Sequence, residues 1–265
     1  MTTTLTSSDG TALAARRSGA GTPLVLVHGA NGDLDTFAFV EPLLAEHHTV
    51  WTYSRRGRGG SGDGPDYSVD REVEDLCTVV DAAGSQVHAV AHCGGAAIAL
   101  LAAPRLPALR SLVLYEPPLR VDGVDPETVE ALLRELEADV ERGLEAFFPL
   151  AGITEEEAAV VRSIPEVWDR ACAGARLAPR EIRTALAEAD RLTTIEQPDV
   201  PTLYLYGEET RSPWFLDPVV VPDRLPKAEV RGIPAQRHLA HAFAPDRFAA
   251  EVLSFTEAAD RAPVP

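Results

Sequence analysis

The sequence predicts an α/β domain in which helices cover both faces of a mostly parallel, eight-stranded sheet, with a helical lid inserted late in the chain. Three observations support this fold class. Short apolar runs alternate with helical patterns through most of the 265 residues. This alternation stops after residue 116 and resumes at residue 201. One of the apolar runs leads through a tight turn directly into a helix.

Seven apolar runs have the length and composition of strands, and they cover residues 11–17, 23–27, 49–53, 87–91, 111–115, 202–206 and 228–233. Turn chemistry at residues 8–10 joins the first of them to a preceding short run, which predicts a hairpin. Helical patterns occupy residues 36–46, 69–83, 94–103 and 245–258. Continuous apolar strands that alternate with helices indicate a parallel sheet that is buried on both faces.

The segment between residues 117 and 200 contains helical patterns and no strand pattern. Pro126 follows an aspartate, an arrangement typical of a helix start, and predicts a helix over residues 126–148. Thr154 begins a capping-box pattern, and a further helical pattern covers residues 179–192. We therefore expect an inserted segment that consists of helices.

The domain boundaries follow from this change of pattern. Residues 1–116 and 201–265 are predicted to form the α/β core, and residues 117–200 a helical lid over the active site. An ordinary peripheral bundle is the alternative interpretation of the inserted helices.

The chain carries 41 acidic and 24 basic residues, which gives a formal net charge of −17 at pH 7. This charge argues against nucleic acid and anionic membrane surfaces as partners. No apolar run approaches the ~20 residues that span a membrane, and the first ten residues lack the features of a secretory signal. We therefore expect a cytoplasmic protein, of which the sequence leaves the oligomeric state open.

The most informative residue is Cys93, which stands where an apolar run meets an Ala/Leu-rich helix. A turn this tight requires small residues two positions away on either side, and Ala91 and Gly95 meet that need. The N–H groups of a helix that starts here favour a thiolate, and the Gly94 N–H is placed to bind an oxyanion. A nucleophilic cysteine is therefore predicted, with a buried structural cysteine as the alternative.

Metal and cofactor sites are not expected. Cys77 and Cys172 lie in helical stretches and share no regular spacing with Cys93, so the three cysteines indicate neither disulfides nor a zinc site. Residues 57–62 fit the pattern G-x-G-x-x-G, but no helix begins there to hold a pyrophosphate. We therefore predict no metal and no cofactor.

Three motifs in order make the chain similar to the α/β-hydrolase superfamily. Residues 24–29 resemble the strand that ends in His-Gly before the oxyanion loop, and residues 56–61 resemble the Arg-Gly-x-Gly-x-Ser turn. Residues 91–95 resemble the nucleophile elbow, with Ala91 in place of a glycine and Cys93 in place of the usual serine. The resemblance covers essentially the whole chain and implies the fold described above.

The resemblance implies a catalytic histidine after the last strand and a carboxylate that orients it. His238 stands at that place, and His241 is the alternative. The usual position of the acid, a few residues after the next-to-last strand, is occupied by Thr210. We predict that Glu116 is the acid instead, because the superfamily also uses the position directly after the strand that precedes the lid.

The remaining roles stay open in part. Glu208 or Glu209 is the alternative to Glu116 if the loop around Thr210 is shifted. The resemblance implies a second oxyanion donor just after residues 28–29, at the backbone N–H of Ala30. The residues predicted to line the substrate pocket are Asn31, His92, Trp168 and Trp214.

These residues predict acyl chemistry through a Cys-His-Glu triad. Cys93 would attack an ester, thioester or lactone carbonyl of a small-molecule acyl substrate, and water or another nucleophile would release the thioester. A hydrolase or an acyltransferase is therefore expected. One alternative is a lyase, cyclase or isomerase of the same fold that works without a covalent intermediate. The other is a small-molecule binding protein without enzymatic activity.

Overall fold

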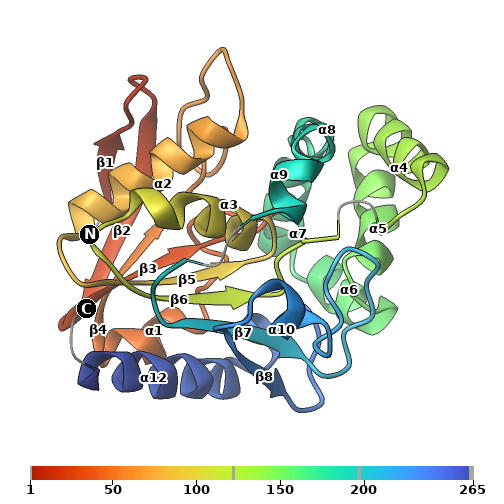
Figure 1. Cartoon of the computed structure of the whole chain (residues 1–265). Helices are drawn as coiled ribbons and strands as arrows, with labels where there is room; N and C mark the ends of the chain where they lie inside the picture. The colour runs from red at the N-terminus through yellow and green to blue at the C-terminus, as the bar shows by residue number, and fades with distance from the viewer. Residues whose placement is uncertain (1, 121–122, 196–197, 263–265) are drawn as a thin grey trace.

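The computed structural model describes residues 2–120, 123–195 and 198–262 of the chain. An eight-stranded sheet with the order β1-β2-β4-β3-β5-β6-β7-β8 forms its centre (Figure 1). The strands are β1 (Thr2–Thr6), β2 (Ala12–Gly19), β3 (Thr22–Val27), β4 (His48–Tyr53), β5 (Val87–His92), β6 (Leu109–Tyr115), β7 (Thr202–Gly207) and β8 (Glu229–Ile233). Strand β2 runs antiparallel to its neighbours β1 and β4, and β3 to β8 are parallel to one another. The predicted fold class and the N-terminal hairpin are thus confirmed.

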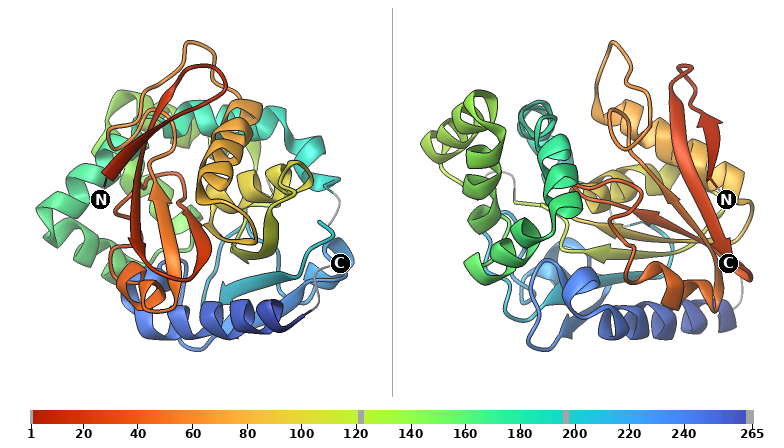
Figure 2. Two further views of the ribbon diagram at one scale, coloured as in Figure 1. Left: turned by 90° about the vertical axis from the view of Figure 1, so that its left-hand side faces the viewer. Right: turned by 180° about the vertical axis from the view of Figure 1, so that it is seen from behind.

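Helices cover both faces of the sheet (Figures 1 and 2). The long helices of the core are α2 (Val69–Ala83), α3 (Gly94–Ala102) and α12 (Pro245–Arg261), and the short ones are α1 (Glu41–Ala45), the 3-10 turn η1 (Ala103–Arg105), α10 (Val221–Arg224) and α11 (Ala240–Phe243). Strand β3 shows how the layers form: Val25 and Val27 pack in the cluster of α2 and α3, whereas Leu24 and Leu26 pack in the cluster of α1 and α12. Because both of its faces are buried, β3 is apolar without interruption from Leu24 to Val27.

Among the described residues, six helices lie between β6 and β7, beyond the carboxyl ends of the parallel strands (Figure 1). They are α4 (Pro126–Ala138), α5 (Val140–Leu150), α6 (Glu155–Ser163), α7 (Pro165–Ala175), α8 (Ala178–Ala187) and α9 (Ala189–Thr193). We call residues 117–200 the inserted segment; its described residues contain no strand, as expected. None of the helices in the described residues is long and apolar enough to cross a bilayer.

Two long helices predicted in the inserted segment are each divided in the structure. The helix predicted over residues 126–148 breaks at Asp139, whose side chain accepts the backbone N–H groups of Glu141 and Arg142 and so caps α5. Helix α5 then folds back onto α4. The two helices approach so closely that a Cβ on Gly143 would lie 2.4 Å from the Leu136 Cα. The helix predicted over 179–192 is likewise split into α8 and α9.

The predicted helix over residues 36–46 is also shorter than expected. Only Glu41–Ala45 is helical, as α1. Before it, the hydroxyl of Thr36 accepts the Asp33 N–H, and the Asp33 carboxylate accepts the Asp35 N–H. Side-chain hydrogen bonds to neighbouring N–H groups stabilise turns in place of a helix.

The start of α3 lies very close to the end of β3. A Cβ on Gly95 would lie 2.4 Å from the carbonyl oxygen of His28 and 2.7 Å from that of Val27, whereas a Cβ on Gly94 would meet no atom within 4 Å. This contact holds the turn at Cys93 against the neighbouring strand.

We expect Gly95→Ala to lower the free energy of unfolding by at least about 1–3 kcal/mol, because the methyl group forces two backbone segments apart. Gly94→Ala is the matched control and should change it by less than about 0.5 kcal/mol or stabilise slightly. Urea unfolding measures both values. Equal stability of the two variants would contradict the close contact.

Candidate active site

Cys93 occupies a strained turn at the carboxyl end of β5. Its backbone has φ 53° and ψ −126°, in the left-handed half of φ space that residues other than glycine rarely adopt. The Cys93 N–H donates to the carbonyl of Tyr115 at 2.9 Å, which attaches the turn to the end of β6. Strain of this kind persists where the surrounding structure enforces it, and it is typical of functional sites.

Glu116 directly follows β6 and also has a positive φ, of 47°. Its side chain is buried, and its two oxygens have different partners. Oε2 accepts a hydrogen bond from Nδ1 of His238 at 2.6 Å, and Oε1 accepts the N–H of Gly207 at 2.9 Å. The carboxylate therefore connects the ends of β6 and β7 with the loop after β8.

The other two glutamates considered for this position do not take it. Glu209 forms an ion pair with Arg237 at 2.6 Å, and Glu208 is exposed at the start of the same loop. The structure thus brings Glu116, and neither Glu208 nor Glu209, into contact with His238.

His238 interacts with both Glu116 and Cys93. Because Nδ1 binds Glu116, Nε2 is the ring atom left for the thiol. Burial alone would lower the pKa of His238, but the Cys93 sulfur and the Glu116 carboxylate outweigh it and raise the pKa to about 10. The ring also stacks on Phe215, with 4.6 Å between centroids. His238 therefore holds a proton more tightly than a free imidazole does.

His241, the alternative to His238, packs among aromatic rings. Its ring packs against Phe37 at 5.3 Å and His92 at 4.6 Å. Burial lowers the pKa of His241 to about 3, and the charge of His238 adds to this effect. His241 is therefore neutral at physiological pH and has no carboxylate partner in the described part of the chain.

His92 precedes the nucleophile position and supports the loop that carries His238. Its Nε2 donates to the His238 carbonyl at 3.0 Å, and the two rings are 4.3 Å apart. Burial, together with the charge of His238, lowers the pKa of His92 well below 6.5. The neutral ring of His92 thus holds the backbone of His238 in place.

A cavity of about 230 Å³ opens beside Cys93 and His238. The core contributes polar groups and the loop after β3 to it, including Gly29, Ala30, Asn31, His92, Cys93, His238 and His241. The inserted segment contributes an apolar wall, with Phe147, Phe148, Ile153, Val161, Val167 and Ala171, and one charged residue, Arg170. Asn31 and His92 thus line the cavity as predicted.

Trp168 and Trp214, the other two predicted pocket residues, do not line this cavity. Trp214 packs against Phe147 with 5.3 Å between ring centroids, and Trp168 packs against Phe148 with 6.4 Å. The tryptophans therefore support the apolar wall from behind. Phe147 and Phe148, which form part of the wall, were not predicted from the sequence. Adjacent aromatic residues in a helical pattern are more often part of the hydrophobic core.

The two donors predicted for an oxyanion come from different elements. Gly94 directly follows Cys93 as the first residue of α3, where backbone N–H groups have no partner within the helix. Ala30, in the loop after β3, lines the cavity, as Cys93 does.

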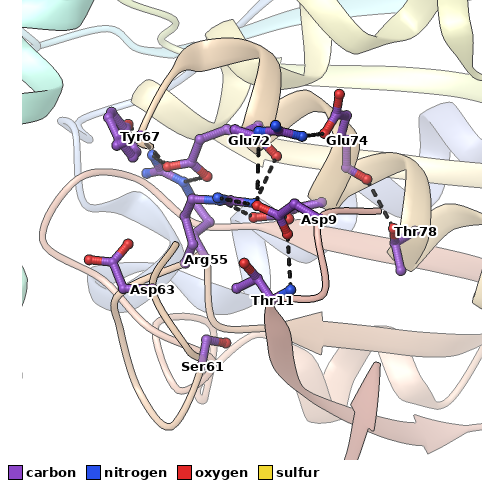
Figure 3. Close-up of polar contacts among 12 residues, drawn as sticks. Asp9, Thr11, Arg55, Ser61, Asp63, Tyr67, Glu72, Glu74 and Thr78 are labelled. Atoms are coloured by element: carbon purple, nitrogen blue, oxygen red, sulfur yellow. Dashed lines mark hydrogen bonds and ion pairs between the residues drawn. The ribbon is translucent and has the colours of Figure 1, made fainter. Parts of the chain in front are cut away.

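Buried ion pairs next to this site were not predicted from the sequence. Arg55 binds Glu72 through Nη2 at 2.7 Å and Nε at 3.1 Å, and Tyr67 donates to the same carboxylate (Figure 3). Arg56 binds Asp75 in the same way, at 2.7 Å from both nitrogens. The spacing of Glu72 and Asp75 on α2 is the signal that could have indicated them, because it places two acidic residues on a face that is otherwise apolar.

No group of histidine, cysteine, aspartate and glutamate side chains in the described residues is arranged to hold a metal ion.

Comparison with known proteins agrees with this fold. The sequence model of the alpha/beta hydrolase family matches residues 24–251, and the chain belongs to this family. It is therefore an α/β-hydrolase enzyme.

Two curated relatives carry names that state an activity. The protein named "Putative carbamate hydrolase RutD" of Azorhizobium caulinodans is 31% identical over 261 residues, which cover 89% of this chain and 92% of that protein. N-formylmaleamate deformylase of Pseudomonas putida is 35% identical over 112 residues, which cover 41% of this chain and 42% of that enzyme.

Solved structures show the same fold. An alpha/beta hydrolase from Sphaerobacter thermophilus superposes with a TM-score of 0.79 at 33% identity, over 96% of this chain and 99% of that one. An esterase from Exiguobacterium antarcticum superposes with a TM-score of 0.80 over 97% and 100%, and at 20% identity it supports the fold alone.

Removing the charge of Glu116 should lower the pKa of His238. We expect Glu116→Gln to lower it by roughly 1–3 units, the usual effect of losing an adjacent opposite charge. An NMR titration of ¹⁵N-labelled imidazoles measures the value. Glu209→Gln is the control and should leave it unchanged, because Glu209 pairs with Arg237. If the pKa of His238 changed in Glu209→Gln and not in Glu116→Gln, the acid would be Glu209, in the loop after β7.

Proposed function

We propose that this enzyme is a hydrolase or acyltransferase that acts on an ester, thioester or lactone carbonyl through Cys93, His238 and Glu116. One observation carries the proposal: a buried carboxylate, an imidazole and a thiol interact in sequence at the carboxyl edge of the sheet. This is the relation of acid, base and nucleophile that covalent catalysis requires.

The chemistry follows from the charges. The Cys93 sulfur and the Glu116 carboxylate raise the pKa of His238. In the proposed reaction the protonated imidazole stabilises the sulfur as the attacking thiolate. The sulfur forms a bond to the carbonyl carbon, and the carbonyl electron pair moves to the oxygen. The N–H groups of Ala30 and Gly94 then bind this oxyanion, and a donor of this kind is typically worth ~10²–10³ in turnover.

Collapse of the tetrahedral intermediate completes the first half of the reaction. The bond to the leaving group breaks, and the leaving group takes the proton from Nε2 of His238. A thioester on Cys93 remains. Water or another nucleophile then attacks it, with neutral His238 as the base, and restores the thiolate and the imidazolium.

We also propose that residues 117–200 act as a lid. Helices α5, α6 and α7 form the apolar wall of the cavity through residues such as Phe147, Phe148 and Val161. A lid of this kind excludes water from the reacting carbonyl and selects the acyl group. The cavity, at about 230 Å³, is smaller than the ~300–1,000 Å³ of sites for drug-sized ligands, which favours a small acyl group.

The activities that the names of these relatives state, deformylation of N-formylmaleamate and hydrolysis of carbamate, support hydrolysis of a small molecule. They also indicate that small N-acyl compounds belong in any substrate panel. A lyase, cyclase or isomerase that uses His238 without an acyl intermediate would show turnover with no covalent adduct. A binding protein would show neither.

The test is to incubate the protein with short acyl thioesters, activated esters and N-formyl compounds and to measure the intact mass. We expect an acyl adduct that maps to Cys93 and is absent from Cys93→Ala. Cys77→Ala and Cys172→Ala are matched controls and should retain the adduct and the turnover, since burial raises the pKa of both thiols.

Cys93→Ala should lose turnover by at least about 10³-fold, as expected for a missing nucleophile. Full turnover in this variant without an adduct in the wild type would refute covalent catalysis. Cys93→Ser separates the two reaction types: faster hydrolysis by this variant would favour acyl transfer as the role of the natural cysteine.

A further inference from the structure

Buried side chains hold the backbone carbonyls of Gly29 and Ala30. The Gly29 oxygen accepts hydrogen bonds from Nδ1 of His28 at 2.8 Å and Nη1 of Arg55 at 3.2 Å. The Ala30 oxygen accepts two from Arg58, at 3.0 and 2.7 Å. Because Nε2 of His28 accepts the Arg55 N–H, the ring proton lies on Nδ1 and is donated to Gly29.

These bonds determine where the neighbouring N–H groups point. In a planar trans peptide the carbonyl of one residue and the N–H of the next are antiparallel. The direction of the Gly29 carbonyl therefore fixes the direction of the Ala30 N–H, and the Ala30 carbonyl does the same for Asn31. A loop whose carbonyls were not held could rotate these peptide units.

Both arginines also bind a residue of the inserted segment. Oε1 of Glu181, on α8, accepts a hydrogen bond from Nη2 of Arg55 at 3.0 Å and a short one from Nη2 of Arg58. The arginine side chains are 2% exposed and that of Glu181 is 12% exposed. Arg55 also pairs with Glu72, whereas Arg58 pairs with Glu181. Removing one partner of a buried pair leaves an uncompensated charge and is strongly destabilising.

We propose that Glu181 is a positioning residue for the reaction: it holds Arg55 and Arg58, which fix the Gly29 and Ala30 carbonyls and so aim the Ala30 N–H. The inference rests on the oxyanion role proposed for Ala30. It follows that the oxyanion site is complete only while α8 is docked on the core.

Two other ion pairs join α8 and α9 to the core without contacting the loop of Gly29 and Ala30. Arg180 binds Asp63 at 2.6 Å, and Arg191 binds Asp70 at 2.9 Å, both between partly exposed side chains. Screened by water, such pairs contribute little. Asp63→Asn therefore removes one weak contact of α8 with the core, leaves α8 docked, and does not touch the residues that hold Gly29 and Ala30.

The experiment compares Glu181→Gln and Asp63→Asn with the wild-type protein. We expect Glu181→Gln to lower kcat for p-nitrophenyl acetate about tenfold with little change in KM, less than the ~10²–10³ for complete loss of an oxyanion donor. Alkylation of Cys93 by iodoacetamide should keep its rate, because reaction at a saturated carbon forms no oxyanion. Amide hydrogen exchange should become faster at residues 28–33. Asp63→Asn should change none of these.

Unchanged kcat and unchanged exchange at residues 28–33 in Glu181→Gln would overturn the proposal. Equal loss of acylation and alkylation, or faster exchange along the whole chain, would also overturn it, because either result means general loosening. If the wild-type protein forms no acyl adduct, the proposed function fails instead. The exchange at residues 28–33 then still decides whether Glu181 holds the loop.

Discussion

The buried hydrogen bond between Glu116 and His238 is the interaction on which the rest of the site depends. Their side chains are 2% and 3% exposed, so water stabilises neither charge and each needs the other. The second oxygen of Glu116 accepts the Gly207 N–H, so one carboxylate joins the ends of β6 and β7 to the loop after β8. Cys93 follows β5 and is attached to the end of β6 through the Tyr115 carbonyl. The Glu116 carboxylate therefore helps to position the loop of His238 relative to Cys93.

The neighbouring groups decide how the pKa values of the buried histidines differ. His238 is the one beside a carboxylate and a sulfur, and its pKa rises to about 10, whereas desolvation lowers the pKa of His28, His92 and His241. The neutral rings have a different use. His92 donates to the backbone of His238, and His28 donates to the backbone of Gly29. His92 thus holds the loop that carries His238, and His28 holds the loop after β3. His238 and Cys93 face the cavity between these two loops.

The sheet and the core helices could be predicted because a strand buried on both faces leaves a continuous apolar run that a single sequence shows. The choice of Glu116 depended on the resemblance to the α/β-hydrolase superfamily, which also uses the position directly after the strand that precedes the inserted helices. The break at Asp139 could not be predicted, since an aspartate on an exposed helical face and one that caps a helix occur in the same pattern. The positions of Trp168 and Trp214 depend on how α5 folds back on α4. The contacts of Glu181 depend likewise on docking between distant segments.

The central claim is that Cys93 bonds to the carbonyl carbon while Ala30 and Gly94 bind its oxygen. A crystal structure of the protein soaked with a short aldehyde tests it most directly, because a thiol adds to an aldehyde to give a tetrahedral mimic of the intermediate. The account predicts continuous density from the Cys93 sulfur to the aldehyde carbon, with the oxygen about 2.7–3.1 Å from both nitrogens. An aldehyde that is not bonded to Cys93, or whose oxygen points away from the two N–H groups, would contradict it.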